Sequence, residues 1–213
     1  MSILLIVFDN QRPDTIAALG NRFIRTPNLD RLVRRGTAFK NAYYMGSTVG
    51  ATCLPSRTML MTGRDLFRIP QREMSEEAEA AHPITDILCL PRILRNYGYR
   101  SMRTGKRGNY PRFAAQEFDT NIVVARSANG SERHANNAIE FLKGRMSDEP
   151  FFLYVAFGAP NDPHVGPGTA PREYMDMYLA GSVPIPPNYM PIHPFDNGEM
   201  IIRDELLAPW PRT

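Results

Sequence analysis

Residues 46–64 read GSTVGATCLPSRTMLMTGR, the pattern of a helix that presents a reactive side chain at its start. Pro55 suits the first turn of a helix, where its missing N–H costs nothing, and Gly63 is a typical C-terminal stop. A helix that begins here places Cys53 and Arg57 where the helix dipole favours an oxyanion. The alternative interpretation is a buried structural cysteine before an ordinary helix. The predicted apolar face of this helix consists of Met59, Leu60 and Met61.

Three segments predict strands of a parallel sheet. Ile3–Phe8 and Pro150–Phe157 are continuous apolar runs, as in strands buried on both faces beneath helices. Tyr99–Thr104 is the third predicted strand, and it is followed by a Gly-Lys pair. Asp9 and Asn10 follow the first run, and polar residues at the carboxyl end of such a strand lie where open α/β sheets bind ligands. A simple turn is the alternative for these two residues.

Three other segments have helical patterns. Thr26 is a candidate N-cap of a helix that ends at Gly36, and Pro91–Tyr97 predicts a short helix with its tyrosine directed inward. A longer helix is predicted from Ser131 to about residue 146. Its first turn contains His134, for which we expect a structural or solvated role rather than a catalytic one. The predicted buried residues of the first and third helices are Leu29, Leu32, Val33, Ala135, Ala138, Ile139 and Leu142.

Length and composition limit the classes of protein to consider. A chain of 213 residues with 43% apolar content is long enough for one sizeable core. The net charge of +3 comes from 25 basic and 22 acidic residues that are interspersed, so nucleic-acid binding gains no support. Apolar runs are too short to cross a bilayer, and Ile3–Phe8 lacks the flanks of a secretory signal. We therefore expect a cytoplasmic protein, or an exported one if its signal lies outside the given chain.

The order C-x-P-S-R followed by T-G-R resembles the signature of the type I sulfatases, a family of the alkaline phosphatase superfamily. The stretch T-P-N-L-D-x-L, which starts at Thr26, is also typical of that family. The resemblance implies that a formylglycine-generating enzyme oxidises Cys53 to formylglycine, an aldehyde whose hydrate is the nucleophile. It also implies an α/β fold with a mostly parallel sheet flanked by helices.

Further site residues follow from the same resemblance. It implies a divalent cation, usually calcium, bound by Asp9, Asn10 and the modified Cys53, although an aspartate is commoner at position 10. Arg57 is implied to hold the nucleophile and its metal, and Lys106 to contact the sulfate. The histidine that normally follows this lysine in the family's G-K-W-H motif is absent.

A second family histidine is also displaced in this chain. Asn161 stands where the family has the histidine that follows its second apolar strand, and His164 comes three residues later. We therefore name His164 as a candidate that reaches the site from a loop. The alternative is that the chain lacks this contact to the sulfate.

The resemblance runs along the whole chain but corresponds to only the first part of a family member. We expect residues 1–157 to supply α/β core elements and residues 158–213, which hold eleven of the nineteen prolines, to form wrapping loops. The fold is therefore expected to be incomplete at the C-terminus. The oligomeric state stays open.

The leading functional hypothesis is a sulfuric ester hydrolase that releases inorganic sulfate from a small-molecule or carbohydrate sulfate ester. One alternative is a phosphodiesterase or phosphonate hydrolase of the same superfamily, since phosphate and sulfate esters are alike in shape and charge. The other is a catalytically silent homologue, which Asn10, Asn161 and the altered G-K motif favour.

Overall fold

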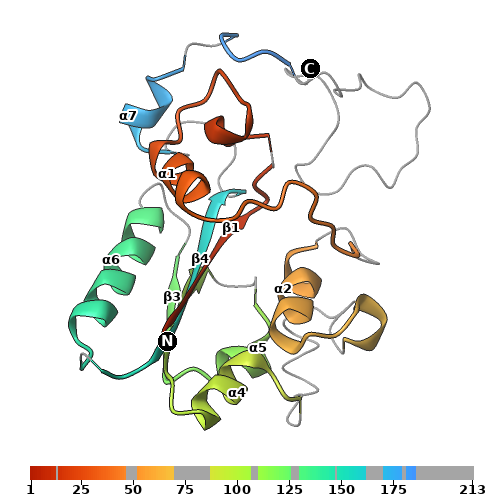
Figure 1. Ribbon diagram of the computed structural model, residues 1–213, viewed down its shortest axis with the longest axis vertical. Helices are drawn as coiled ribbons and strands as arrows, with labels where there is room; N and C mark the ends of the chain where they lie inside the picture. Colours follow the sequence, from red (N-terminus) through yellow and green to blue (C-terminus); the bar gives the residue numbers. More distant parts are fainter. Residues whose placement is uncertain are drawn as a thin grey trace. The chain divides into compact units, whose positions relative to one another are not determined.

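A parallel sheet is the centre of the computed structural model of this protein (Figure 1). The structure describes residues 1–12, 14–46, 52–69, 87–106, 110–125, 130–146, 148–161, 170–178 and 181–185. Within them the sheet has four strands in the order β1-β4-β2-β3, and each pairs in parallel with its neighbours. The strands are β1 (Ile3–Asp9), β2 (Arg100–Lys106), β3 (Thr120–Val124) and β4 (Phe151–Pro160).

Helices cover both faces of this sheet, which makes a three-layer α/β/α arrangement (Figure 1). The α-helices are α1 (Pro27–Arg35), α2 (Cys53–Thr62), α4 (Leu90–Asn96), α5 (Arg112–Ala115), α6 (Gly130–Lys143) and α7 (Arg172–Met175). The described residues also include the 3-10 helices η1 (Ala17–Leu19) and η2 (Leu66–Arg68). Within the described residues none of the helices combines the length and apolar character that crossing a membrane requires. The predicted α/β fold with a parallel sheet is confirmed.

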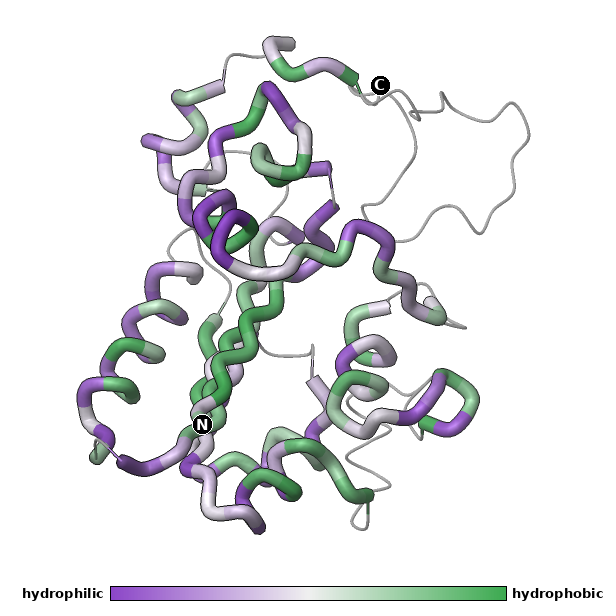
Figure 2. The backbone as a smooth tube through the Cα atoms, in the orientation of Figure 1, coloured by the Kyte–Doolittle hydropathy of each residue, from purple (hydrophilic) through white to green (hydrophobic). Residues whose placement is uncertain are grey.

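Two apolar clusters hold the layers together. On one face, Phe152 and Tyr154 of β4 pack with residues of α2, α4 and α5. On the other face, Leu153 and Val155 pack against the apolar side of α6. The alternation follows from the strand geometry, because successive side chains point to opposite faces of the sheet. Figure 2 shows the strands as the most continuous apolar segments and α6 as a helix of alternating character.

The prediction for β1 is wrong in one respect, since this strand is covered on one face only. Leu4, Ile6 and Phe8 on its other face are exposed, and Leu4 retains 52% of its surface. The reason is topological, because β1 is at the edge of the described sheet whereas β4 lies between two strands. An unbroken apolar run does not by itself distinguish an edge strand from a central one.

Three predictions about helix faces are also wrong. Leu32 of α1, Tyr97 after α4 and Ile139 of α6 are all exposed.

The predicted N-cap of α1 is also wrong, because Thr26 does not cap this helix through its side chain. Its hydroxyl instead accepts a hydrogen bond from the Ala17 N–H at 2.9 Å and donates to an Asp30 oxygen at 2.8 Å.

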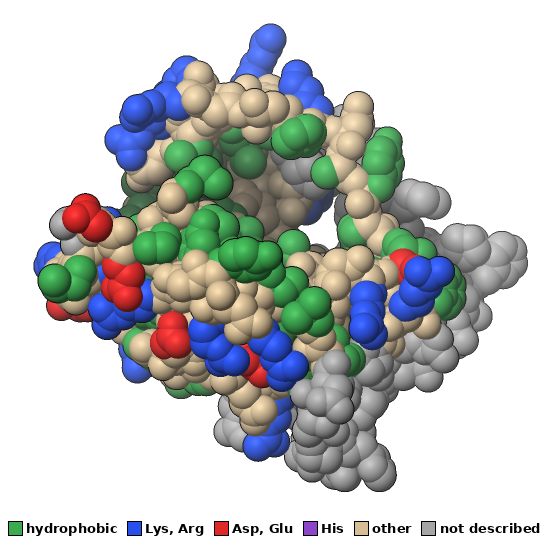
Figure 3. All heavy atoms as spheres, turned by 60° about the horizontal axis from the view of Figure 1, so that its bottom comes forward, with side chains coloured by type: hydrophobic (Ala, Val, Ile, Leu, Met, Phe, Trp, Pro, Cys, Tyr) green, Lys and Arg blue, Asp and Glu red, His purple; other side chains and the backbone are tan. Residues whose placement is uncertain are grey.

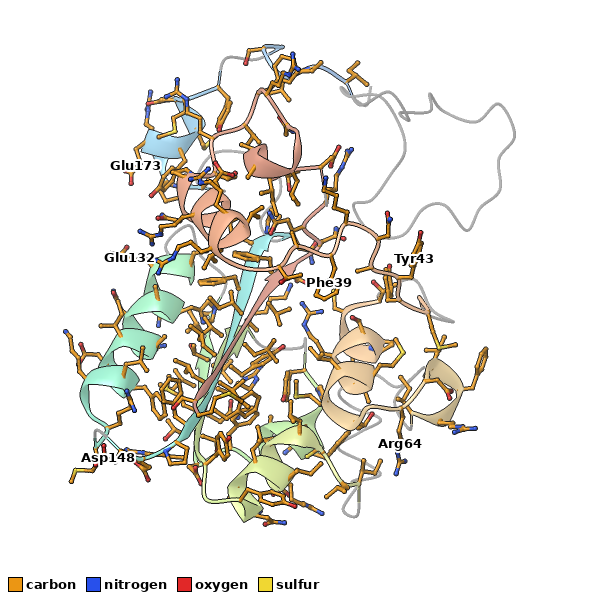
Figure 4. All side chains as sticks on the ribbon, viewed as in Figure 1. Phe39, Tyr43, Arg64, Glu132, Asp148 and Glu173 are labelled. Atoms are coloured by element: carbon orange, nitrogen blue, oxygen red, sulfur yellow. The ribbon has the colours of Figure 1, made fainter. Side chains whose placement is uncertain are left out.

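The chain divides into two units, Met1–Asp176 and Met177–Thr213, and all the elements named above belong to the first. Figure 3 looks onto one face of the molecule and shows acidic and basic side chains mixed on its surface, as the near balance of charges predicts. The segment that leads into α2 carries the exposed side chains of Phe39 and Tyr43 (Figure 4).

Candidate active site

Three neighbouring strands end at the same place in the sheet. Asp9 ends β1, Lys106 ends β2, and Asn161 directly follows β4, which lies between them. The Asn161 N–H donates to the Asp9 carbonyl oxygen at 3.0 Å. Because all the strands run in parallel, their carboxyl ends meet at one edge, which is where open α/β sheets bind ligands.

The carboxylate of Asp9 is the centre of this cluster. Its Oδ1 accepts a hydrogen bond from Arg57 Nη2 at 2.8 Å. Its Oδ2 lies 2.7 Å from Lys106 Nζ and accepts from Asn161 Nδ2 at 3.0 Å. Asp9 is only 1% exposed, and burial alone raises the pKa of a carboxyl group. The two cations and the Asn161 amide outweigh this effect, and they hold the pKa of Asp9 at about 2.

Cys53 joins the cluster from the first residue of α2. Its thiol donates to Asp9 Oδ1 at 3.3 Å, and Arg57 Nη1 donates to the Cys53 carbonyl oxygen at 3.1 Å. Burial and the neighbouring Asp9 charge raise the pKa of the Cys53 thiol, against the opposing influence of Arg57. The thiol is therefore protonated at neutral pH, and an unmodified cysteine here is a poor nucleophile.

The local sequence of α2 explains how these groups are presented. Pro55 lies in the first turn, and Gly63 ends the helix with a φ of 65° while its N–H donates to the Met59 carbonyl oxygen at 2.9 Å. The buried face is not the predicted apolar trio, since Leu60 is exposed. The buried residues of the helix are Pro55, Arg57, Thr58 and Met61. Arg57 and Met61 thus lie on the same buried face of α2, with Arg57 at the site and Met61 in the apolar core.

The structure brings together most of the side chains named from the sequence. Cys53, Arg57 and Lys106 all contact Asp9. Asn10 is exposed and adopts a left-handed conformation with a φ of 61°, so its position is that of a turn at the end of β1. His164 lies outside the described residues.

Sequence reasoning missed two residues of the cluster. The sequence marks Asn161 only as the replacement for a family histidine, yet this residue binds Asp9 through both its backbone and its side chain. The other is Arg103, which no sequence motif marks, although it is 3% exposed and its guanidinium donates to the Lys106 carbonyl oxygen at 3.2 Å. The available signal was an arginine near the end of the predicted strand Tyr99–Thr104, because a charged side chain on a strand of a parallel sheet needs a specific partner if it is buried.

The described residues do not by themselves fit a divalent cation. Asp9 is the right type of ligand, but both its oxygens are bound by cationic side chains. Within the part of the chain that the structure describes, no group of three or more His, Cys, Asp and Glu side chains is placed to hold a metal ion. A cation at Asp9 thus requires ligands from outside the described residues and a rearrangement of Arg57 or Lys106.

Known proteins match this chain along most of its length. A sulfatase family model matches residues 2–186. An arylsulfatase of Clostridium perfringens is 27% identical, with 87% of this chain and 47% of the relative aligned. Human N-sulphoglucosamine sulphohydrolase is 31% identical over 69% of this chain and 28% of the relative. The chain therefore spans less than half the length of these relatives.

Solved structures agree in fold. One is a complex with D-glucosamine-2-N,6-O-disulfate, which matches with a TM-score of 0.64 at 23% identity over 88% of this chain and 39% of that chain. Another is a phosphonate monoester hydrolase of Agrobacterium radiobacter, with a TM-score of 0.61 at 19% identity over 86% of this chain and 45% of that one. The family model covers far more than half of the chain. The chain belongs to the sulfatase family.

Proposed function

We propose that this chain carries the nucleophile and the oxyanion-binding residues of a sulfuric ester hydrolase that releases inorganic sulfate. The observation that carries the proposal is the convergence of Cys53, Arg57 and Lys106 on the Asp9 carboxylate. Together with Asp9 of β1, these residues of α2 and β2 place two cations, Arg57 and Lys106, beside the cysteine that the family oxidises. A sulfate ester needs positive charge next to a strong nucleophile, and this arrangement supplies both.

In this proposal the side chain at position 53 is formylglycine in the active protein. Its hydrate supplies an oxygen nucleophile that attacks sulfur and displaces the alcohol, and loss of sulfate then regenerates the aldehyde. Asp9 Oδ1, which accepts from the Cys53 thiol, is placed to accept a hydrogen bond from a hydroxyl at the same position and so to orient it. Arg57 fixes that residue through its carbonyl oxygen, and Lys106 neutralises negative charge on the ester oxygens.

We extend the proposal to a divalent cation, and by family resemblance to calcium. Asp9 and Asn10 are the ligands that this chain would contribute, next to the modified Cys53. The current contacts of Asp9 argue that the ion enters only when groups outside the described residues complete its coordination. No catalytic step proposed here depends on it.

The proposed substrate class is a small-molecule or carbohydrate sulfate ester. The relatives that support this class include a sulphohydrolase named for N-sulphoglucosamine and a structure that holds a glucosamine disulfate. The second candidate is hydrolysis of a phosphonate or phosphodiester. A phosphonate monoester hydrolase shares the fold, and both ester types present a tetrahedral anionic centre to the same cations.

The test is expression with a formylglycine-generating enzyme, followed by mass spectrometry of the peptide that contains position 53. We expect an aldehyde at Cys53 and none at Cys89, which is buried in the core and serves as the internal control. The converted protein is then assayed with matched aryl sulfate, phosphate and phosphonate esters. Faster sulfate release, lost in Cys53→Ala, is the expected result.

Other outcomes decide between the alternatives. Faster release of phosphate or phosphonate would favour the second candidate. Conversion at position 53 without hydrolysis of any ester, together with no binding of inorganic sulfate, would identify a catalytically silent homologue. Cys53 that stays unmodified in a host that converts other C-x-P-S-R sequences would contradict the proposal.

A further inference from the structure

Arg103 of β2 is a buried cation to which the proposed mechanism gives no role. Its guanidinium makes contacts with neutral groups, namely Asn121 Oδ1 at 2.8 Å, the Lys106 carbonyl oxygen at 3.2 Å and the ring of Tyr110, whose centroid is 4.6 Å from Cζ. Among the described residues no carboxylate pairs with Arg103. Burying a charge without a counter-ion is costly, so such a residue is expected to have a function beyond packing.

The path of this side chain explains the glycine that precedes Lys106. Residues 103 and 105 point to the same face of β2, because side chains alternate along a strand. The Arg103 side chain therefore lies across Gly105. A Cβ built on Gly105 would be 2.9 Å from Arg103 Nη2 and 3.2 Å from Cζ, which is too close. A side chain at 105 would therefore require the end of the Arg103 side chain to shift from its present position, and it would also come within 3.3 Å of the Ala156 Cβ.

The contact with that carbonyl fixes the end of the strand that carries the site lysine. Lys106 is 6% exposed, and its Nζ lies 2.7 Å from Asp9 Oδ2. Asn121 of β3 anchors the other arm of the same guanidinium. Arg103 thus links the Lys106 carbonyl group to Asn121, the β3 residue that is the partner of Arg103 in the sheet register, and Lys106 is the last β2 residue paired with β3.

We propose that Arg103 is a positioning residue, which holds Lys106 against Asp9 by binding the Lys106 carbonyl oxygen across Gly105. A planar guanidinium reaches two acceptors at once, which an ammonium group on a lysine does not. The role of Lys106 toward the sulfate rests on the proposed function, whereas the placement of Lys106 does not.

The placement is tested by the chemical reactivity of Lys106. The full chain is treated with methyl acetimidate, and modification of each lysine is followed by peptide mass spectrometry. Lys143 is 69% exposed and gives the internal reference rate. In the wild type we expect Lys106 to be strongly protected. Arg103→Met is expected to raise the ratio of the Lys106 rate to the Lys143 rate about tenfold. In the wild type the end of β2 can open and expose Lys106 only if the charge-assisted hydrogen bond from Arg103 breaks, and the variant lacks that bond.

Matched variants distinguish a positioning effect of Arg103 on Lys106 from a general effect of losing a positive charge. Arg100→Met removes the same charge from the exposed start of β2, and it should leave the ratio unchanged. Arg103→Lys should not restore protection, since the charge returns without the two-armed contact. Gly105→Ala should raise the ratio by displacing Arg103, and adding it to Arg103→Met should produce no further increase.

Two results would overturn the inference. One is a folded Arg103→Met protein in which Lys106 is as protected as in the wild type. The other is a Gly105→Ala effect that adds fully to that of Arg103→Met. If Arg103→Met does not fold, Gly105→Ala and Asn121→Leu test the inference in its place. Both variants keep the buried Arg103 guanidinium but disturb its contacts. An unchanged ratio in these two variants would also overturn the inference.

Calorimetry with inorganic sulfate tests the proposed function separately. Lys106→Met and Arg103→Met should both weaken binding of sulfate, by about tenfold each if a charge-assisted contact is lost. Sulfate binding that is insensitive to Lys106→Met would refute the sulfate role of Lys106, and it would leave the labelling result intact. Weakened binding in Lys106→Met but not in Arg103→Met would refute the positioning role.

Discussion

Thr104 Oγ1 lies 2.9 Å from His134 Nδ1 in the buried contact between β2 and α6. Asn137 Nδ2 donates to the same hydroxyl at 3.2 Å, so the hydroxyl proton is available for a neutral imidazole. Burial, followed by the charges of Arg103 and Arg133, lowers the pKa of His134 to about 4. His134 therefore has the structural role that its place in the helix predicted.

The first prediction concerns pH. The folded state holds His134 neutral while the unfolded state protonates it near pH 6.5, so protons favour unfolding between pH 6.5 and about 4. The contribution of His134 to stability is complete above pH 6.5. It should fall by about 2 kcal/mol between pH 6.5 and pH 5, at about 1.4 kcal/mol per pH unit.

Urea unfolding of wild type and His134→Gln at pH 7.5 and pH 5 measures this effect. The variant should lose much of the wild-type pH dependence, whereas Glu140→Gln on the exposed side of α6 should keep it. Equal pH dependence in wild type and His134→Gln would show that His134 is not the responsible group.

The second prediction concerns the charge balance at the site. Asp9→Asn leaves Arg57 and Lys106 buried without the carboxylate that they both bind. Removing one member of a buried charge cluster typically costs about 3–5 kcal/mol of unfolding free energy. Asp14→Asn breaks an exposed pair with Arg12 and should cost less than about 1 kcal/mol. Similar losses in the two variants, compared by urea unfolding, would contradict the buried cluster.

The third prediction concerns calcium. Because Asp9 is the one site carboxylate among the described residues and is bound by two cations, residues 1–213 should bind calcium only weakly, with a Kd of about 1 mM or above. Asn10→Asp adds a second carboxylate at a position whose left-handed backbone an aspartate tolerates, and it should tighten binding. Isothermal titration calorimetry measures both. Tight binding that survives Asp9→Ala would place the ion elsewhere, and Asp14→Ala serves as the control.

The fourth prediction concerns the sheet. Leu153 of β4 is fully buried, whereas Leu4 on the paired strand β1 is 52% exposed. Leu153→Ala should cost about 2–5 kcal/mol, as for other buried leucines. Leu4→Ala should cost about 1 kcal/mol or less. Denaturant unfolding of the two variants compares the same chemical change at paired positions. A larger loss in Leu4→Ala would show that the outer face of β1 is covered in solution.

Much of the fold was predictable because it depends on local patterns. The apolar runs Ile3–Phe8 and Pro150–Phe157 became strands, and Pro55 and Gly63 lie at the two ends of α2. The wrong predictions concern residues whose local sequence pattern is compatible with two different sets of tertiary contacts. Thr26 has the chemistry of an N-cap, but its hydroxyl bonds to η1 and to Asp30 instead.

The sequence alone determined three of the four described strands, the start and end of α2, the sulfatase motif around Cys53 and most of the candidate site residues, whereas β3 was found only in the structure. Only the tertiary structure decided that Arg57 and Lys106 share the Asp9 carboxylate, that Asn161 joins them and that β1 lies at an edge. The physical reason is separation along the chain. Asp9 lies 48 residues from Arg57 and 152 from Asn161, and such contacts exist only once the order of the strands has brought their ends together.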